Sequence, residues 1–148
     1  MFAELNAEPF LDNFHVQLLA SRLDRVRLGT ARRIAIALPP RNLKSIIVSV
    51  VLPAWLLGHN PATQIICASY GQDLANKLSG DCRQVMLSAW YRRLFPAAQL
   101  AAGKQAIDRY ETTAGGARKA TSVGGVLTGF GADVIIVDDP MKPDEAYS

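Results

Sequence analysis

Residues 33–45 read RIAIALPPRNLKS, an apolar run followed by two prolines and a Lys-Ser pair. The run 33–38 is rich in isoleucine and alanine, which is typical of a strand buried on both faces of a parallel sheet. Residues 44–57 have the length of a helix and are followed by glycine and Asn-Pro stop signals. Pro53 is expected to remove one backbone hydrogen bond from this helix and to kink it. A strand, a turn and a helix in this order predict an α/β fold.

The Lys-Ser pair at the start of that helix has the residue types of a phosphate-binding loop. Such a loop needs N–H groups at a helix N-terminus, a lysine for the β and γ phosphates, and a hydroxyl for magnesium. Lys44 and Ser45 supply the last two groups, whereas Leu43 and Leu38 stand where the motif normally has glycine. Taken alone, the pair is interpreted equally well as a solvated helix start.

A second stretch, residues 134–139 (VIIVDD), predicts a fully apolar strand that ends in two carboxylates. Asp138 is expected to hold the magnesium that Ser45 also contacts, and Asp139 to polarise an attacking water. A turn or a helix cap is the alternative for the aspartates alone. The joint occurrence of both stretches favours a nucleotide site.

The rest of the chain predicts alternating strands and helices, with no internal repeat. The further elements that we expect are a helix over 10–27, a strand over 64–68, an amphipathic helix over 72–94, an antiparallel hairpin over 107–122 with Gly115-Gly116 in its middle, and a glycine-rich loop before residue 134. The predicted fold class is α/β: a P-loop NTPase-like, three-layer α/β/α domain with a mostly parallel sheet and a β-hairpin insertion.

Composition excludes several other classes of protein. The 148 residues are 49% hydrophobic and 20% charged, as in a single globular domain, and the net charge of +3 does not indicate a partner. Cys67 and Cys82 lack the spacing of a zinc site and are expected to be free, buried thiols of an intracellular protein. The start of the chain lacks the pattern of a signal peptide, and its most apolar run is too short to span a membrane.

Several stretches recur in the order in which a known family has them. They are Phe14-His15 before a helix, Pro39-Pro40-Arg41 running into Lys44-Ser45, Pro53-Ala54-Trp55-x-Leu57-Gly58, Ala68-Ser69-Tyr70, and Ser122-Val123-Gly124-Gly125-x-Leu127-Thr128-Gly129-x-Gly131-Ala132-Asp133 leading to Asp138-Asp139-Pro140. Together they resemble the ATPase domain of phage terminase large subunits, over almost the whole chain.

The resemblance implies a partial P-loop ATPase domain over residues 1–148, with a helical lead-in over about 1–30 and a core over about 31–148. It implies ATP and Mg²⁺ as cofactors. The loop that it implies for phosphate binding consists of Pro40, Arg41, Asn42, Leu43, Lys44 and Ser45. It implies magnesium binding by Ser45 and Asp138. The catalytic residues that it implies are Lys44, Asp139 as the water-orienting carboxylate, and Arg41 as a charge stabiliser. The implied partners are double-stranded DNA, a phage portal, a small terminase subunit and further copies in a ring. The implied location is the cytoplasm of a bacterial host, without a membrane.

The family pattern reads Pro-Pro-Arg-x-Gly-Lys-Ser, so Leu43 replaces its glycine. The chain ends shortly after Asp139, so we expect no nuclease domain and an incomplete sheet with an open edge. Two alternatives stay open at this stage. One is a non-catalytic prophage remnant that retains the fold, and the other is a small basic protein that binds DNA through its arginine clusters.

Overall fold

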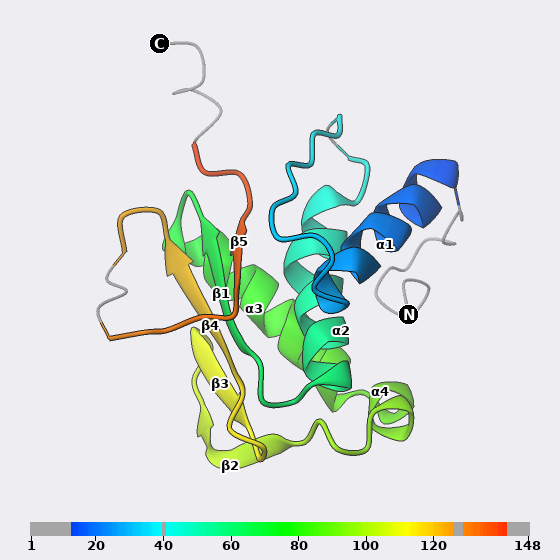
Figure 1. Ribbon diagram of the computed structural model, residues 1–148. Coiled ribbons are helices and arrows are strands. Elements are labelled where there is room, and N and C mark those ends of the chain that lie inside the picture. Colours follow the sequence, from blue (N-terminus) through cyan, green and yellow to red (C-terminus); the bar gives the residue numbers. More distant parts are fainter. Residues whose placement is uncertain (1–12, 40, 126–128, 142–148) are drawn as a thin grey trace. The chain divides into compact units, whose positions relative to one another are not determined.

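A computed structural model describes residues 13–39, 41–125 and 129–141 of the chain (Figure 1). The chain divides into two compact units, Met1–Pro39 and Pro40–Ser148. Helix α1 belongs to the first unit, and all other helices and strands belong to the second. No described helix is both long enough and apolar enough to cross a membrane.

The first unit contains α1 (Phe14–Arg27), whose buried side chains Val16, Leu19 and Leu23 follow helical spacing. This agrees with the helix expected over 10–27, of which residues 10–12 lie outside the described part. The strand expected over 33–38 is wrong: these residues form neither helix nor strand, and most of their side chains are exposed. A strand requires a neighbour for its backbone hydrogen bonds, and no other strand is described in this unit.

The second unit is built on a five-stranded sheet. Its elements are a helix that begins at Lys44 and continues through the π-helical stretch η2 (Ile46–Val51) into α2 (Leu52–His59), then β1 (Gln64–Ser69), α3 (Gln72–Leu87), α4 (Ala89–Leu94), β2 (Leu100–Gln105), β3 (Arg109–Thr112), β4 (Ala117–Ser122) and β5 (Val134–Val137). The strand order is β2-β3-β4-β1-β5. The pairings of β1 with β4 and β5 are parallel, and those of β3 with β2 and β4 are antiparallel. The sheet is therefore mixed, not mostly parallel as expected.

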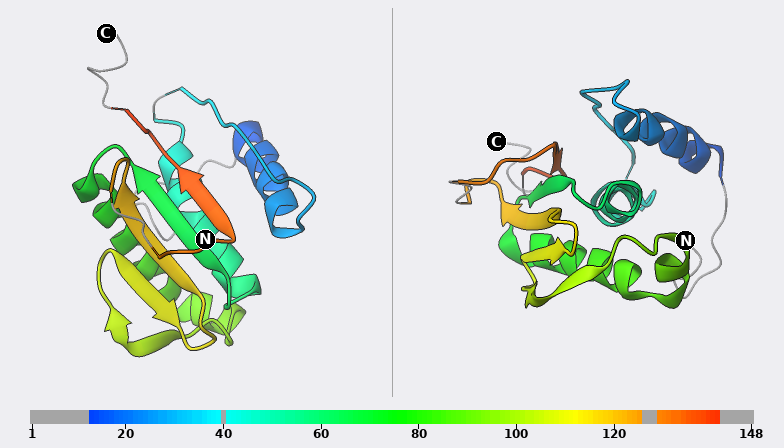
Figure 2. Two further views of the ribbon diagram at one scale, coloured as in Figure 1. Left: turned by 60° about the vertical axis from the view of Figure 1, so that its left-hand side comes forward. Right: turned by 60° about the horizontal axis from the view of Figure 1, so that its bottom comes forward.

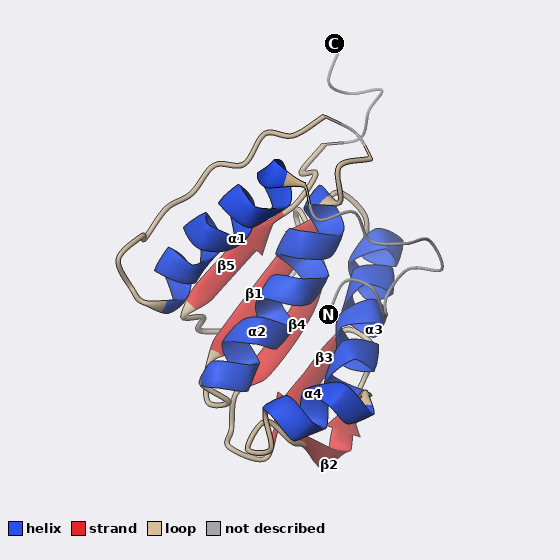
Figure 3. Ribbon diagram, turned by 90° about the vertical axis from the view of Figure 1, so that its right-hand side faces the viewer, coloured by secondary structure: helices blue, strands red, loops and turns tan. Residues whose placement is uncertain are grey.

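Helices α2, α3 and α4 lie on one face of this sheet (Figure 3). Cys67, Ala120 and Ile136 are in register across three parallel strands, share a face and are all buried. No described helix of this unit covers the other face, so the unit shows two layers, where three were expected. Accordingly Ile135 and Val137 are 65% and 55% exposed, although the strand predicted at 134–137 is fully apolar, and the burial on both faces that such a run indicates is not found.

The helix expected over 72–94 is interrupted at Ser88. Its ψ of 147° is extended, and its hydroxyl accepts a hydrogen bond from the Tyr91 N–H at 3.3 Å while donating to the Val85 carbonyl at 2.7 Å. Serine competes in this way for backbone partners, which ends α3 and starts α4. The Tyr91 hydroxyl then donates to the Ala54 carbonyl at 2.7 Å and ties α4 to α2.

The expected hairpin corresponds to β3 and β4, which are antiparallel and joined through Gly115-Gly116. It is part of the sheet itself, because β4 also pairs in parallel with β1 along its whole length. Strand β2, which completes this side of the sheet, was not predicted from its sequence, LAAGKQ.

Strand β5 forms an open edge beside β1 (Figure 2). An exposed apolar edge favours pairing with other chains. We expect the protein to self-associate as its concentration rises, and the Ile135→Lys variant to associate less, since a charged edge residue opposes strand pairing. Sedimentation velocity over a concentration series measures this. Leu94→Lys, at a 59% exposed position on α4, is the matched control. Equal association of the Ile135→Lys variant and the unmodified protein would contradict the expectation.

Candidate functional site

The candidate site lies where the parallel strands β1 and β5 end, within the second unit. Hydrogen bonding continues past the end of β5, because the Asp138 N–H donates to the Ala68 carbonyl at 2.9 Å and the Tyr70 N–H donates to the Asp139 carbonyl at 3.0 Å. These bonds hold both aspartates against the end of β1. Carboxyl ends of parallel strands are the usual place for ligand sites in α/β sheets.

Lys44 joins the two aspartates from the start of the helix. Its ammonium forms an ion pair with Asp139 Oδ1 and lies 3.4 Å from Asp138 Oδ1. The hydrogen bond to Asp139 raises the pKa of Lys44 above its ordinary value, so the ammonium is protonated at neutral pH. Asp138 is 4% exposed, whereas the Asp139 side chain is 47% exposed. The structure therefore brings together three residues that the sequence singled out, from segments 95 positions apart.

The hydroxyl bonded to Asp138 comes from Ser49, a residue that the sequence analysis did not consider. Ser49 is buried, and its hydroxyl donates to Asp138 Oδ2 at 3.0 Å. Ser45 makes no capping hydrogen bond with its side chain. Its expected contact with a magnesium ion shared with Asp138 stays a prediction. A signal for Ser49 was present: it is the one hydroxyl in the run IIVSVV, four residues after Ser45 and hence on the same helix face.

Backbone strain is concentrated in this site. Of the described residues, three non-glycines have positive φ: Arg41 (65°), Leu43 (59°) and Asp139 (46°). Such angles cost roughly 1–3 kcal/mol each and are found mainly at ligand-binding and active sites. Leu43 thus has a left-handed conformation that glycine adopts without strain. Arg41 is exposed and Asn42 half-buried, and Pro40 lies outside the described residues.

The loop and helix start can bind an anion. The helix begins directly after Leu43, whose carbonyl accepts the Ile47 N–H at 2.9 Å. The N–H groups of its first turn face outward at the positive end of the helix dipole. Two left-handed residues around Asn42 suit a loop that turns its N–H groups toward an anion.

A divalent cation fits this donor set only together with further ligands. Among the described residues, no group of three or more His, Cys, Asp or Glu could hold a metal ion. Mg²⁺, however, commonly takes one or two carboxylates and completes its shell with phosphate oxygens and water. The Asp138 carboxylate and the Ser45 hydroxyl are of the type that such a shared site uses.

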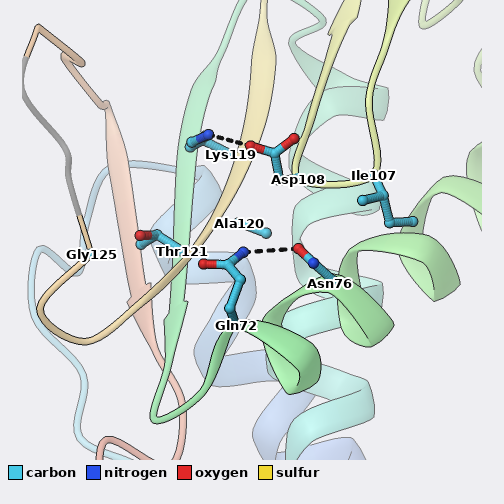
Figure 4. Close-up of a pocket in the computed structure, with 8 residues that line it drawn as sticks. All are labelled: Gln72, Asn76, Ile107, Asp108, Lys119, Ala120, Thr121 and Gly125. Atoms are coloured by element: carbon cyan, nitrogen blue, oxygen red, sulfur yellow. Dashed lines mark hydrogen bonds and ion pairs between the residues drawn. The ribbon is translucent and has the colours of Figure 1, made fainter.

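A separate cavity of about 330 Å³ lies between the start of α3, the 107–108 turn and β4 (Figure 4). Its polar groups pair with one another. Lys119 forms an ion pair with Asp108, and this hydrogen bond lowers the pKa of the Asp108 carboxyl. Gln72 donates to Asn76 at 2.8 Å and accepts from the Ser122 N–H at 3.1 Å. The Lys119 and Asp108 charges in this cavity therefore neutralise each other.

Comparison with known proteins adds no assignment, since neither the protein-family models nor the curated proteins searched contain a match to this sequence.

Proposed function

We propose that the second unit binds ATP together with Mg²⁺ at Lys44, Ser45 and Asp138. The observation that carries this proposal is the convergence of Lys44, Asp138 and Asp139 where a helix begins and a parallel strand ends. Phosphoryl transfer needs positioning and charge neutralisation more than covalent chemistry, and this convergence offers both.

Each residue has a role in the proposal. Lys44 exchanges one of its carboxylate partners for the β and γ phosphates. These phosphates also accept hydrogen bonds from the N–H groups in the first turn of the helix that begins at Lys44. Asp138 and Ser45 would hold Mg²⁺, which when bound neutralises phosphate charge. Asp139, more exposed than Asp138, orients the attacking water, and Arg41 stabilises charge from the loop.

On the resemblance described above, the proposed biological role is that of the ATPase segment of a DNA-packaging motor of the terminase large-subunit type. Double-stranded DNA, a portal, a small terminase subunit, a homo-oligomeric ring and the cytoplasm of a bacterial host belong to this proposal. A non-catalytic descendant that binds nucleotide without turnover is the alternative, and the strained leucine in the loop favours it.

DNA binding by the first unit is a second candidate function. A cavity of about 510 Å³ there is lined by Arg22, Arg25 and Arg33. Phosphate contacts by these residues would give duplex binding without nucleotide that weakens steeply with salt. Binding that does not depend on salt would eliminate this candidate.

Calorimetric titration with ATP, with and without Mg²⁺, tests the proposed nucleotide site directly. Saturable binding at one site, tighter with Mg²⁺ and weaker for ADP, is expected because Lys44 and Asp138 serve the terminal phosphates and the cation. The absence of saturable binding at millimolar ATP would refute the proposal. Phosphate release measured on the same samples separates an ATPase from a nucleotide-binding descendant.

Replacing Leu43 with glycine is expected to tighten ATP binding several-fold. Glycine removes the side chain next to the phosphate position and adopts a φ of 59° without strain. Leu43→Ala is the matched control, since it also removes the isobutyl group but keeps a Cβ at the same φ. The glycine variant should be more stable than the alanine variant by about 1 kcal/mol. Chemical denaturation and ATP titration of both variants measure these effects. Equal or weaker affinity of the glycine variant would show that the loop has adapted to leucine.

A further inference from the structure

Arg118, the second residue of β4, is a buried cation that forms no ion pair within the described part of the chain. It is 0% exposed, and the ion pairs among the described residues include none to it. The groups around it are neutral at pH 7, because burial raises the pKa of Cys67 to about 11 and that of the Tyr110 hydroxyl well above its ordinary value. Two guanidinium nitrogens, Nε and Nη1, have no hydrogen-bond partner in the described part of the chain.

The remaining nitrogen of Arg118 bonds to a backbone carbonyl of the helix that contains Pro53. Nη2 donates to the Ser49 carbonyl at 3.0 Å. In an α-helix that carbonyl would accept the N–H of residue 53, but residue 53 is proline and has none. The helix passes through the π-helical stretch η2 just before Pro53. Arg118 thus gives the Ser49 carbonyl a donor that Pro53 cannot supply.

Ser49 connects this turn to the candidate site. Its carbonyl accepts from Arg118, and its hydroxyl donates to Asp138 Oδ2 at 3.0 Å. We propose that Arg118 is a positioning residue for nucleotide binding, which holds the η2 turn so that Ser49 keeps the Asp138 carboxylate directed at Lys44. This inference rests on the proposed function. It names a residue that acts on Asp138 through Ser49 and not by direct contact.

Energetics separate this role from a purely structural one. A buried charge with unsatisfied donors costs stability, and its replacement by an apolar side chain of similar size is often neutral or stabilising. Arg118→Met should therefore melt at the same temperature as the unmodified protein or higher. Its affinity for Mg-ATP should nevertheless fall about tenfold, as is typical when a group that orients a metal-binding side chain is lost.

The decisive experiment is a double-mutant cycle with Pro53. Pro53→Ala restores an N–H that can donate to the Ser49 carbonyl, so Pro53→Ala in the Arg118→Met background should recover part of the lost affinity. Arg118→Lys, which keeps the charge and one donor nitrogen, should lose less affinity than Arg118→Met. Unchanged Mg-ATP affinity of a folded Arg118→Met variant would overturn the inference. If that variant does not fold, wild-type affinity of Arg118→Leu, which likewise removes every donor, would overturn it instead.

Amide hydrogen exchange distinguishes failure of this inference from failure of the proposed function. Arg118→Met should speed exchange of the amides of η2 relative to those of α3, and Pro53→Ala should reverse this, whether or not nucleotide binds. If the unmodified protein does not bind ATP but these exchange rates change as expected, the proposed function fails and the contact between Arg118 and the turn stands. Unchanged exchange in η2 refutes the positioning role itself.

Discussion

Replacing both Lys44 and Asp138 with alanine is expected to abolish measurable Mg-dependent ATP binding. Truncating one partner of a hydrogen-bonded charge pair typically costs about 2–5 kcal/mol when the other partner is buried, as Asp138 is, and this is roughly 30-fold or more in affinity. Lys44→Ala alone should weaken ATP binding by this factor with or without Mg²⁺, whereas Asp138→Ala should mainly remove the gain from Mg²⁺. Titration of the two single variants and the double variant checks this.

Lys77→Ala is the control for these titrations. Lys77 also pairs with an aspartate, Asp81 at 3.4 Å, but the pair is exposed on α3. Exposed pairs contribute about 0–1 kcal/mol, so neither stability nor affinity should change much. Mg-dependent ATP affinity that persists in the double variant of Lys44 and Asp138 would place the nucleotide site elsewhere.

Replacing Gly116 with alanine is expected to have the largest effect on stability. A Cβ at this buried position would lie 2.2 Å from the Pro61 carbonyl oxygen and 2.8 Å from that of Thr63. Both contacts are with backbone, which cannot rotate away, and the Gly116 N–H itself donates to Pro61 at 3.1 Å. The hairpin would have to move away from the start of β1, at a cost of about 2–3 kcal/mol or more. Urea denaturation measures the loss.

Two glycine variants provide comparisons for that experiment. Gly131→Ala meets no atom within 4 Å and needs no positive φ, so it should be nearly neutral. Gly115→Ala also meets no atom, but has a φ of +87°, so it should lose about 1 kcal/mol through backbone strain alone. If Gly116→Ala is no more destabilising than Gly115→Ala, close packing of the hairpin against the chain before β1 is not important for stability.

The local sequence pattern predicted those helices and strands whose formation depends on residues close together in the sequence. The apolar runs at 64–68 and 134–137 are strands β1 and β5, and most of the helix expected over 10–27 is α1. The Lys-Ser pair and the two aspartates were identified from their position next to such elements. The structure brings Lys44, Asp138 and Asp139 together because a helix start and a strand end are the places where polar groups emerge from an apolar core.

Tertiary structure alone decided the remaining features, because they depend on partners distant in sequence. Residues 33–38 have the composition of a strand, yet a strand forms only where a neighbouring strand accepts its hydrogen bonds. Ser49 is an ordinary helix residue until Asp138 lies beside its hydroxyl. In the sequence, Arg118 resembles any basic residue of a polar hairpin. It is a buried cation only because β4 pairs with β1 beneath a helix that contains Pro53, which has no N–H to donate.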